Sequence, residues 1–240
     1  MLMGPQNLPD RLECVRRRIE KAAAEAGRHV DSITLLAVTK GQPAQAIRAA
    51  AAGGVRDFGE SYLQEALDKI AAVGESGLTW HFIGRLQSNK TRPVAEGFAW
   101  AHAVDRLKIA QRLAEQRPYY APPLNVCLQV NVAGEDSKGG VGFAELPALA
   151  TAVAALPRLK LRGLMCLPPQ EDDPGRQRHW FRKLREALDG LNRSGLELDT
   201  LSMGMSEDLE AAILEGTTIV RVGTALFGPR PPLDHQASVQ

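Results

Sequence analysis

This chain has few cysteines, no long apolar run and almost no net charge. The three cysteines, Cys14, Cys127 and Cys166, are widely spaced and show neither a disulfide framework nor metal-ligand spacing. We therefore expect reduced cysteines and a cytoplasmic protein. No stretch approaches the roughly 18 apolar residues of a membrane span, and residues 1–13 have no apolar core of signal-peptide type. We expect no membrane association.

The charges of the chain are balanced. The 29 basic and 28 acidic residues give a formal charge of +1, which offers no electrostatic case for nucleic acid as a partner. The basic stretches at 16–18 and 176–185 lie in helical patterns with glutamate nearby, which is typical of solvated helix faces. The balance also gives no reason to expect a large assembly, so we expect a monomer.

Strand-like and helix-like segments alternate along the 240 residues. We expect strands over 33–40, 55–59, 79–84, 98–104, 124–132, 159–167, 198–203 and 217–222, with helices between them. Eight such strands predict an α/β protein, a closed (β/α)8 TIM barrel, with an extra amino-terminal helix over 8–27. We expect one domain spanning 1–240, with a flexible tail over 229–240. A doubly wound open sheet is the alternative, but it needs no eighth strand.

Lys40 is the most informative residue. It ends the apolar run 33–39 and precedes Gly41, so it lies at the carboxyl end of the first strand, where barrels of this type carry functional residues. Partial desolvation there lowers the pKa of an amine from about 10.4 and leaves more of the neutral nucleophile that imine formation requires. A lysine that simply extends from a strand end into solvent is the alternative.

The loops after the seventh and eighth strands carry residues suited to an anion. Ser206 is placed to cap the helix expected over 206–215, where a hydroxyl and free amides bind anions. Gly223 permits close approach of backbone amides, and Thr224 adds a donor. The acids that follow Ser206 oppose an anion unless they point into solvent. An ordinary cap and a turn glycine explain each feature alone, but their joint placement beside the Lys40 strand favours a phosphate site.

A lysine beside a phosphate site indicates a phosphorylated aldehyde or ketone, and pyridoxal 5′-phosphate (PLP) satisfies both requirements. Arg221 lies two positions before Gly223 and therefore faces the same side of the sheet. We expect it to donate to the pyridine nitrogen, keeping that atom unprotonated and the ring a weak electron sink. A salt bridge within the barrel is the alternative role for Arg221.

Several segments are similar to those of a known family. They are Leu-Ala-Val-Thr-Lys at 36–40, Phe-Gly-Glu at 58–60, Trp-His-Phe-Ile-Gly-Arg-Leu-Gln-Ser-Asn-Lys at 80–90, Gln-Val-Asn at 129–131, Gly-Leu-Met at 163–165, and the segments 201–208 and 220–228. Over nearly its whole length the chain resembles the pyridoxal phosphate homeostasis proteins, of the proline-synthetase co-transcribed type. The resemblance implies a barrel like the amino-terminal domain of alanine racemase. It also implies that Lys40 forms the Schiff base and that Ser206, Gly223 and Thr224 hold the phosphate.

Other residues in the matching segments are less specific. The segment 201–208 adds Met203 to the expected cofactor contacts. His81 lies inside the third strand, where a cofactor contact and a hydrogen-bonded core histidine are both open, and Asn89 follows that strand near the expected mouth of the site. Ser61 is a departure, because the family usually has asparagine there. An amide-dependent contact at that position is therefore in doubt.

The leading hypothesis for function is a PLP-binding protein of vitamin B6 homeostasis. It would buffer or deliver the cofactor, with apo-forms of PLP enzymes as recipients and little or no catalysis of its own. The resembling racemases place a tyrosine from an additional β-domain opposite the lysine. We expect Tyr119 and Tyr120 at the other end of the barrel and Tyr62 at the start of a helix. The alternatives are a PLP-dependent racemase or decarboxylase, and a Schiff-base aldolase that binds a sugar phosphate without a cofactor.

Overall fold

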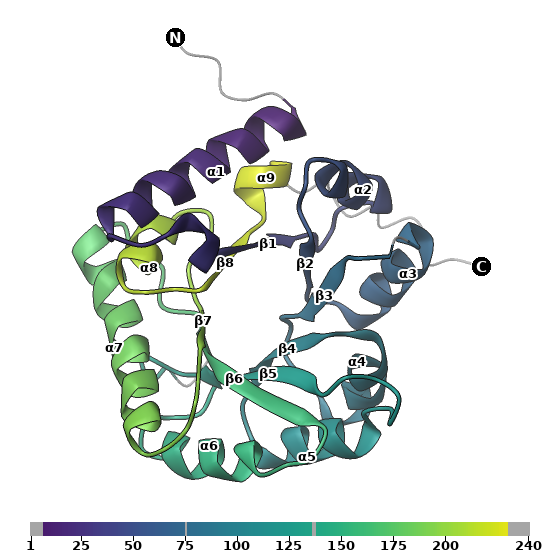
Figure 1. Ribbon diagram of the computed structural model, residues 1–240, viewed down its shortest axis with the longest axis vertical. Coiled ribbons are helices and arrows are strands. Elements are labelled where there is room, and N and C mark those ends of the chain that lie inside the picture. The colour runs from purple at the N-terminus through teal and green to yellow at the C-terminus, as the bar shows by residue number, and fades with distance from the viewer. Residues whose placement is uncertain (1–6, 75, 136–137, 230–240) are drawn as a thin grey trace.

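The computed structural model describes residues 7–74, 76–135 and 138–229. Eight parallel strands pair in chain order from β1 to β8 and close into a barrel, with the helices outside it (Figure 1). The strands are β1 (Thr34–Val38), β2 (Asp57–Glu60), β3 (Thr79–Phe82), β4 (Trp100–Val104), β5 (Leu124–Val130), β6 (Leu159–Cys166), β7 (Thr200–Ser202) and β8 (Ile219–Val222). The (β/α)8 barrel expected from the sequence is confirmed. Of the tail expected over 229–240, residues 230–240 lie outside the described residues.

The α-helices are α1 (Leu8–Glu25), α2 (Ala44–Ala52), α3 (Leu63–Val73), α4 (Thr91–Gly97), α5 (Leu107–Gln116), α6 (Leu146–Ala154), α7 (Pro174–Arg193), α8 (Leu209–Leu214) and α9 (Thr224–Phe227). The extra amino-terminal helix is α1, which packs across α8 and α9 (Figure 1). Two short 3-10 turns, at Val30–Ser32 and Ser88–Lys90, precede β1 and α4. The sequence did not predict α9, because its four residues are too short for a helical apolar pattern.

Barrel closure brings the first and last strands together. Thr34 pairs with Ile219 and Ala37 with Val222, so the chain after β1 and the chain after β8 leave the barrel side by side. Because all strands are parallel, their carboxyl ends share one rim. Lys40, two residues beyond β1, therefore lies on the same rim as the loop after β8.

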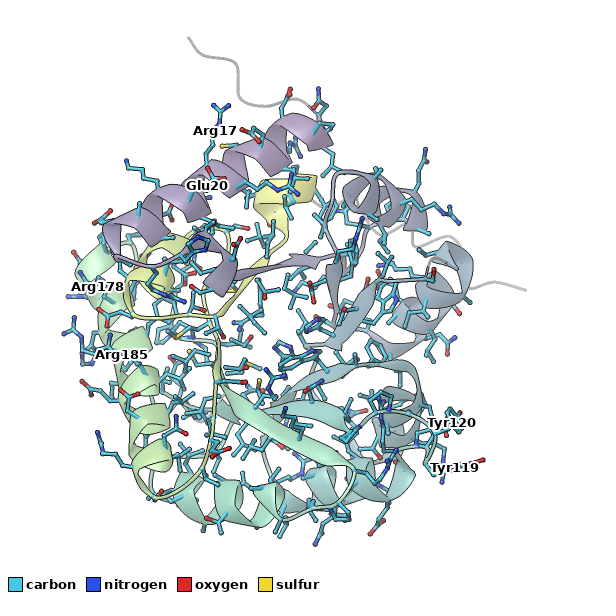
Figure 2. All side chains as sticks on the ribbon, in the orientation of Figure 1. Arg17, Glu20, Tyr119, Tyr120, Arg178 and Arg185 are labelled. Carbon is cyan, nitrogen blue, oxygen red and sulfur yellow. The ribbon has the colours of Figure 1, made fainter. Side chains whose placement is uncertain are left out.

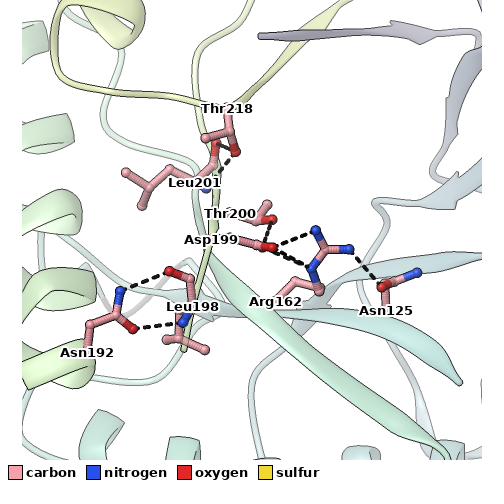
Figure 3. Close-up of polar contacts among 8 residues, drawn as sticks. All are labelled: Asn125, Arg162, Asn192, Leu198, Asp199, Thr200, Leu201 and Thr218. Carbon is pink, nitrogen blue, oxygen red and sulfur yellow. Dashed lines mark hydrogen bonds and ion pairs between the residues drawn. The ribbon is translucent and has the colours of Figure 1, made fainter. Parts of the chain in front are cut away.

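Polar contacts join the amino ends of the later strands at the opposite rim (Figure 3). The guanidinium of Arg162 on β6 binds both carboxylate oxygens of Asp199 and donates to the side-chain oxygen of Asn125 on β5 at 3.0 Å. Asn192, near the end of α7, exchanges two bonds with the backbone of Leu198 just before β7. This rim is held by paired groups, which suits a structural role.

Within the described ranges, no helix is long and apolar enough to cross a membrane. The same residues contain no group of three or more His, Cys, Asp or Glu side chains that could hold a metal ion.

Candidate functional site

A cavity of about 710 Å³ opens at the carboxyl ends of β1, β2, β3, β6, β7 and β8. Five of the eight residues expected at the cofactor site lie in its wall: Lys40, Ser206, Arg221, Gly223 and Thr224. They come from three separate segments of the chain. The barrel rim therefore brings together an amine, a guanidinium, two hydroxyl groups and the backbone of a glycine around one cavity.

Lys40 is half-buried, and the backbone on both sides of it is held in place. Before it, the backbone N–H of Thr39 donates to the carbonyl of Gly59 at 3.0 Å. After it, the N–H of Gly41 donates to the Glu65 carboxylate at 2.6 Å, and Gly41 has a φ of 73°, a conformation that glycine adopts without strain. The amine of Lys40 is thus carried on a short, fixed segment.

A buried ion pair supports that segment from the outer side of the barrel. Lys69 on α3 donates to the carbonyl of Thr39 at 2.6 Å and to Glu60 Oε1 at 2.9 Å. Thr39 Oγ1 donates to the same Glu60 oxygen at 2.6 Å. Burial raises the pKa of Glu60, and the bonds from Thr39 and Lys69 oppose that rise. This ion pair was not predicted from the sequence, although a glutamate at the end of a strand and a lysine on the helix that follows could have indicated it.

Arg221 is buried inside the barrel and bonds to neutral acceptors. Its Nη1 donates to the carbonyl oxygen and the hydroxyl of Ser202, and its Nη2 donates to the carbonyl of Cys166 at 2.8 Å. Burial lowers the pKa of the guanidinium. Among the described residues none of its bonds goes to a carboxylate, so the salt-bridge alternative is not what the structure shows. A guanidinium has five N–H groups, and three of those of Arg221 make these bonds. The other two, the N–H of Nε and one N–H of Nη2, have no acceptor among the described residues.

Ser206 does not cap the helix that follows it, contrary to expectation. That helix, α8, begins at Leu209 after Asp208, and Ser206 Oγ instead accepts from the backbone N–H of Ala225 in α9 at 3.2 Å. The bond joins the loop after β7 to the loop after β8. Since the hydroxyl oxygen is the acceptor there, its own hydrogen can be donated to an oxygen in the cavity.

Gly223 and Thr224 offer backbone donors. In the described residues neither backbone N–H has a backbone acceptor. A Cβ on Gly223 would lie 3.3 Å from the carbonyl oxygen of Val38, so a larger residue would crowd the junction between β1 and β8. The glycine keeps the backbone accessible at this point of the cavity.

The two acids that follow Ser206 also line the cavity. Glu207 is exposed at the cavity edge, whereas Asp208 is half-buried and accepts from the backbone N–H of Met205 at 2.5 Å. Burial raises the pKa of Asp208, while the Met205 bond and the charge of Arg221 lower it.

The structure places the other three expected residues away from the cavity wall. Met203 is fully buried in the layer between the barrel and its helices, because alternate strand residues face opposite sides. Asn89 is exposed in the 3-10 turn before α4. His81 is buried inside the barrel, where both ring nitrogens have protein partners, His102 and Asp57. The core-histidine alternative describes His81 better than a cofactor contact.

Several cavity residues were not expected. Tyr62 and Arg85, which follow β2 and β3, line the cavity, as do Glu171 and Gln177 from the β6–α7 connection and α7. Position alone could have indicated Tyr62 and Arg85, because each follows the end of an expected strand. Ser61 also lines it. Tyr119 and Tyr120 are exposed in the loop between α5 and β5, at the amino ends of the strands and thus at the other end of the barrel, as expected (Figure 2). Tyr62 is the tyrosine that the fold brings to the cavity.

Comparison with known proteins identifies the family. The family model for the alanine racemase N-terminal domain matches residues 11–231. The chain is 62% identical to the pyridoxal phosphate homeostasis protein of Pseudomonas aeruginosa over 216 residues, which cover 90% of this chain and 93% of that one. It is 54% identical to the protein of that name from Escherichia coli K12 over 219 residues, covering 90% and 94%.

Solved structures agree. PipY of Synechococcus elongatus PCC7942 without PLP superposes with a TM-score of 0.83 at 37% identity, covering 92% of this chain and all of that chain. PipY with PLP bound gives a TM-score of 0.79 at 38% identity, covering 88% and 100%. On these similarities, which run along almost the whole of both partners, the chain belongs to the pyridoxal phosphate homeostasis protein family, with a barrel of the alanine racemase N-terminal type.

Proposed function

We propose that this protein binds PLP in the rim cavity and serves in vitamin B6 homeostasis by buffering or delivering the cofactor. When bound, PLP supplies an aldehyde that condenses reversibly with an amine. Lys40 is the amine that would take part. Ser206, Gly223 and Thr224 would bind the phosphate, and Arg221 would donate to the ring nitrogen.

The observation that carries this proposal is the set of donors around one cavity. An aldehyde phosphate with a basic ring nitrogen needs an amine, several hydrogen-bond donors for its phosphate oxygens, and one donor for the nitrogen. The cavity holds all three: the amine follows β1, the donor for the ring nitrogen is on β8, and the donors for the phosphate lie in the loops after β7 and β8. The names of the curated relatives and the PLP-bound structure of PipY support the same ligand.

Homeostasis rather than catalysis is the role that the relatives' names support. A donor-only arginine beside the ring nitrogen suits storage, because it leaves that nitrogen unprotonated and the ring poor at stabilising carbanions. We propose a monomer in the cytoplasm whose recipients are apo-forms of PLP enzymes.

The test is the absorbance spectrum of the protein with added PLP, before and after borohydride reduction, followed by peptide mapping. We expect a visible band that reduction removes, and a phosphopyridoxyl group on Lys40. Lys40→Ala should lose the band while keeping the same melting curve, and Lys90→Ala, at an exposed lysine outside the cavity, should keep it. A wild-type protein that gives no band would refute the proposal. An adduct on another lysine would refute the assignment of Lys40.

A catalytic alternative has one observation in its favour. Tyr62, 60% exposed, lines the same cavity as Lys40 and could supply a second acid–base group. A racemase or decarboxylase would exchange the α-hydrogen of amino acids in deuterated water, and Tyr62→Phe would slow that exchange. No exchange above that of free PLP favours the binding role.

A further inference from the structure

A continuous chain of hydrogen bonds crosses the inside of the barrel. Asp57 Oδ1 lies 3.0 Å from His81 Nε2, and His81 Nδ1 lies 2.9 Å from His102 Nε2. His102 Nδ1 lies 2.8 Å from Ser202 Oγ, which lies 2.8 Å from Arg221 Nη1. The residues come from β2, β3, β4, β7 and β8 in turn. The chain therefore links a carboxylate at the amino end of β2 to a residue of the cavity wall.

The middle of this chain is shielded from water. His81 and His102 are 1% and 0% exposed. The indole of Trp100 stacks on the His81 ring at 5.4 Å between centroids, and the Arg162 guanidinium lies 4.9 Å above Trp100. Among the described residues, the two imidazole rings thus have only each other, Asp57 and Ser202 as hydrogen-bond partners.

The two ends of this series of hydrogen bonds, together with the burial of its rings, fix the direction of each bond. A carboxylate can only accept, so His81 carries a hydrogen on Nε2 and donates it to Asp57. Burial favours neutral rings, so His81 Nδ1 is an acceptor and takes the hydrogen of His102 Nε2. His102 Nδ1 is then an acceptor as well, for the hydroxyl hydrogen of Ser202. At the other end arginine can only donate, so Ser202 Oγ accepts from Arg221, and both histidines are of the Nε2–H form.

Burial supports this assignment. It lowers the pKa of His81, which the bond with Asp57 opposes. It lowers the pKa of His102 well below the ordinary value, and the repulsion that a charged His102 would meet from a charged His81 and from Arg221 acts in the same direction. Both effects favour the neutral rings on which the bond directions depend.

We propose that Asp57, His81, His102 and Ser202 form a positioning relay that fixes the guanidinium of Arg221 for the ligand of the cavity. It rests on the proposed function only for the identity of that ligand. None of the four relay residues lines the cavity, so they act through Arg221.

The critical group is the Ser202 hydroxyl, which can rotate. With His102 Nδ1 as acceptor, the hydroxyl hydrogen points away from Arg221 and its lone pair points toward Nη1. Without that acceptor the hydrogen can turn toward the guanidinium and remove one of its three bonds. Aligned bonds between a carboxylate and a guanidinium also polarise one another, so the effect of Asp57 extends along the chain.

The relay can be tested in the ligand-free protein by ¹⁵N NMR. We expect both rings in the Nε2–H form and a slowly exchanging Nη1–H signal for Arg221, the group that bonds to Ser202. His102→Leu, which removes the acceptor, should speed exchange of that signal about tenfold, the loss expected for one hydrogen bond to a charged group. His102→Asn, whose side-chain oxygen can replace Nδ1, should restore slow exchange.

A second pair of variants tests the far end. Asp57→Asn should shift the ring resonances of both His81 and His102, although only His81 touches it. Asp31→Asn is the control, because it removes a carboxylate just before β1 that pairs with the exposed His29 and contacts neither the relay nor Trp100. If His102→Leu does not fold, the comparison of Asp57→Asn with Asp31→Asn still tests the relay.

PLP titration then relates the relay to the proposed ligand. We expect His102→Leu to bind PLP about tenfold more weakly than wild type with a shifted absorbance band, and His102→Asn to recover both. An Nδ1–H ring at either histidine, or an Arg221 signal and a PLP band unchanged in His102→Leu, would overturn the relay. A wild-type protein with the expected NMR signals that binds no PLP would keep the relay and refute the proposed function.

Discussion

Lys69 Nζ lies 2.9 Å from Glu60 Oε1, and both side chains are buried behind the segment that carries Lys40. Because Lys69 also bonds to the carbonyl of Thr39, the pair ties α3 to the end of β1. We predict that Lys69→Met lowers the free energy of unfolding by about 3–5 kcal/mol, because it leaves a buried carboxylate without its cation. Urea denaturation measures the loss.

The double variant separates charge from packing. Glu60 Oε2 has no hydrogen-bond partner in the described structure, so the pair is incompletely satisfied. Lys69→Met with Glu60→Gln should therefore be more stable than Lys69→Met alone. The control is Arg17→Met on α1 (Figure 2), which breaks the exposed pair of Arg17 with Glu13 and should cost less than about 1 kcal/mol. Equal losses for both single variants would contradict this account.

Glu215 is a buried carboxylate that three arginines of α7 surround. Arg178, Arg182 and Arg185 lie 2.7, 3.0 and 2.8 Å from its oxygens. Their spacing places them on one helix face, and Figure 2 labels Arg178 and Arg185 on α7. Burial acts to raise the pKa of Glu215, but the bonds and charges of the arginines outweigh it and lower the pKa.

The direction of that shift sets the pH dependence. A carboxyl group whose pKa is lowered by folding stabilises the fold above its ordinary value of 4.5, and this is lost as pH falls through the folded value. We predict that Glu215→Gln costs about 2 kcal/mol at neutral pH and much less in acid. Glu20→Gln, at an exposed site on α1 (Figure 2), should show neither effect. Urea denaturation midpoints of the wild type and of both variants, measured from neutral to acid pH, test this prediction. A loss of stability in Glu215→Gln that does not change with pH would contradict it.

The three cysteines should differ in reactivity. Burial raises the pKa of both Cys127 and Cys166 to about 12, whereas Cys14 is exposed on α1. Because the thiolate is the reactive form, we predict that a disulfide reagent such as dithiobis(nitrobenzoate) modifies one thiol in the native protein and three after denaturation. Cys14→Ser should remove the native reaction. A second fast-reacting native thiol would show that the barrel interior is accessible.

The sequence predicted the barrel because its signals are local. Each strand and each helix shows its own apolar pattern, and parallel strands that alternate with helices leave few topologies. The same reasoning placed Lys40 and Gly223 at one rim. Each follows the end of a strand that the local pattern predicts, and parallel strands have their carboxyl ends at the same rim.

The sequence could not predict contacts that depend on the geometry of closure. Ser206 bonds to Ala225 rather than to its own helix because the β7 and β8 loops meet only in the closed barrel. His81 finds a partner on the next strand rather than the cofactor for the same reason. Such pairs leave no periodic pattern in the chain, so local rules could only offer alternatives.

Gly223 is the residue whose size should matter most for the ligand. Its added Cβ would lie 3.3 Å from the Val38 carbonyl, a contact that the backbone can relieve only by moving a few tenths of an ångström. We predict that Gly223→Ala weakens PLP binding about tenfold while changing the free energy of unfolding by less than about 1 kcal/mol, because the crowding falls on the cavity wall rather than on the core.

The control for that variant is another glycine-to-alanine change. Gly190 lies inside α7, where an added Cβ meets only the tip of the Arg193 side chain at 3.8 Å. Gly190→Ala should raise the free energy of unfolding by about 0.5–1 kcal/mol, since alanine loses less backbone entropy in a helix, and should leave PLP affinity unchanged. For each variant, absorbance titration gives the PLP affinity and urea denaturation gives the free energy of unfolding. Undiminished affinity in Gly223→Ala would show that the phosphate does not approach this backbone.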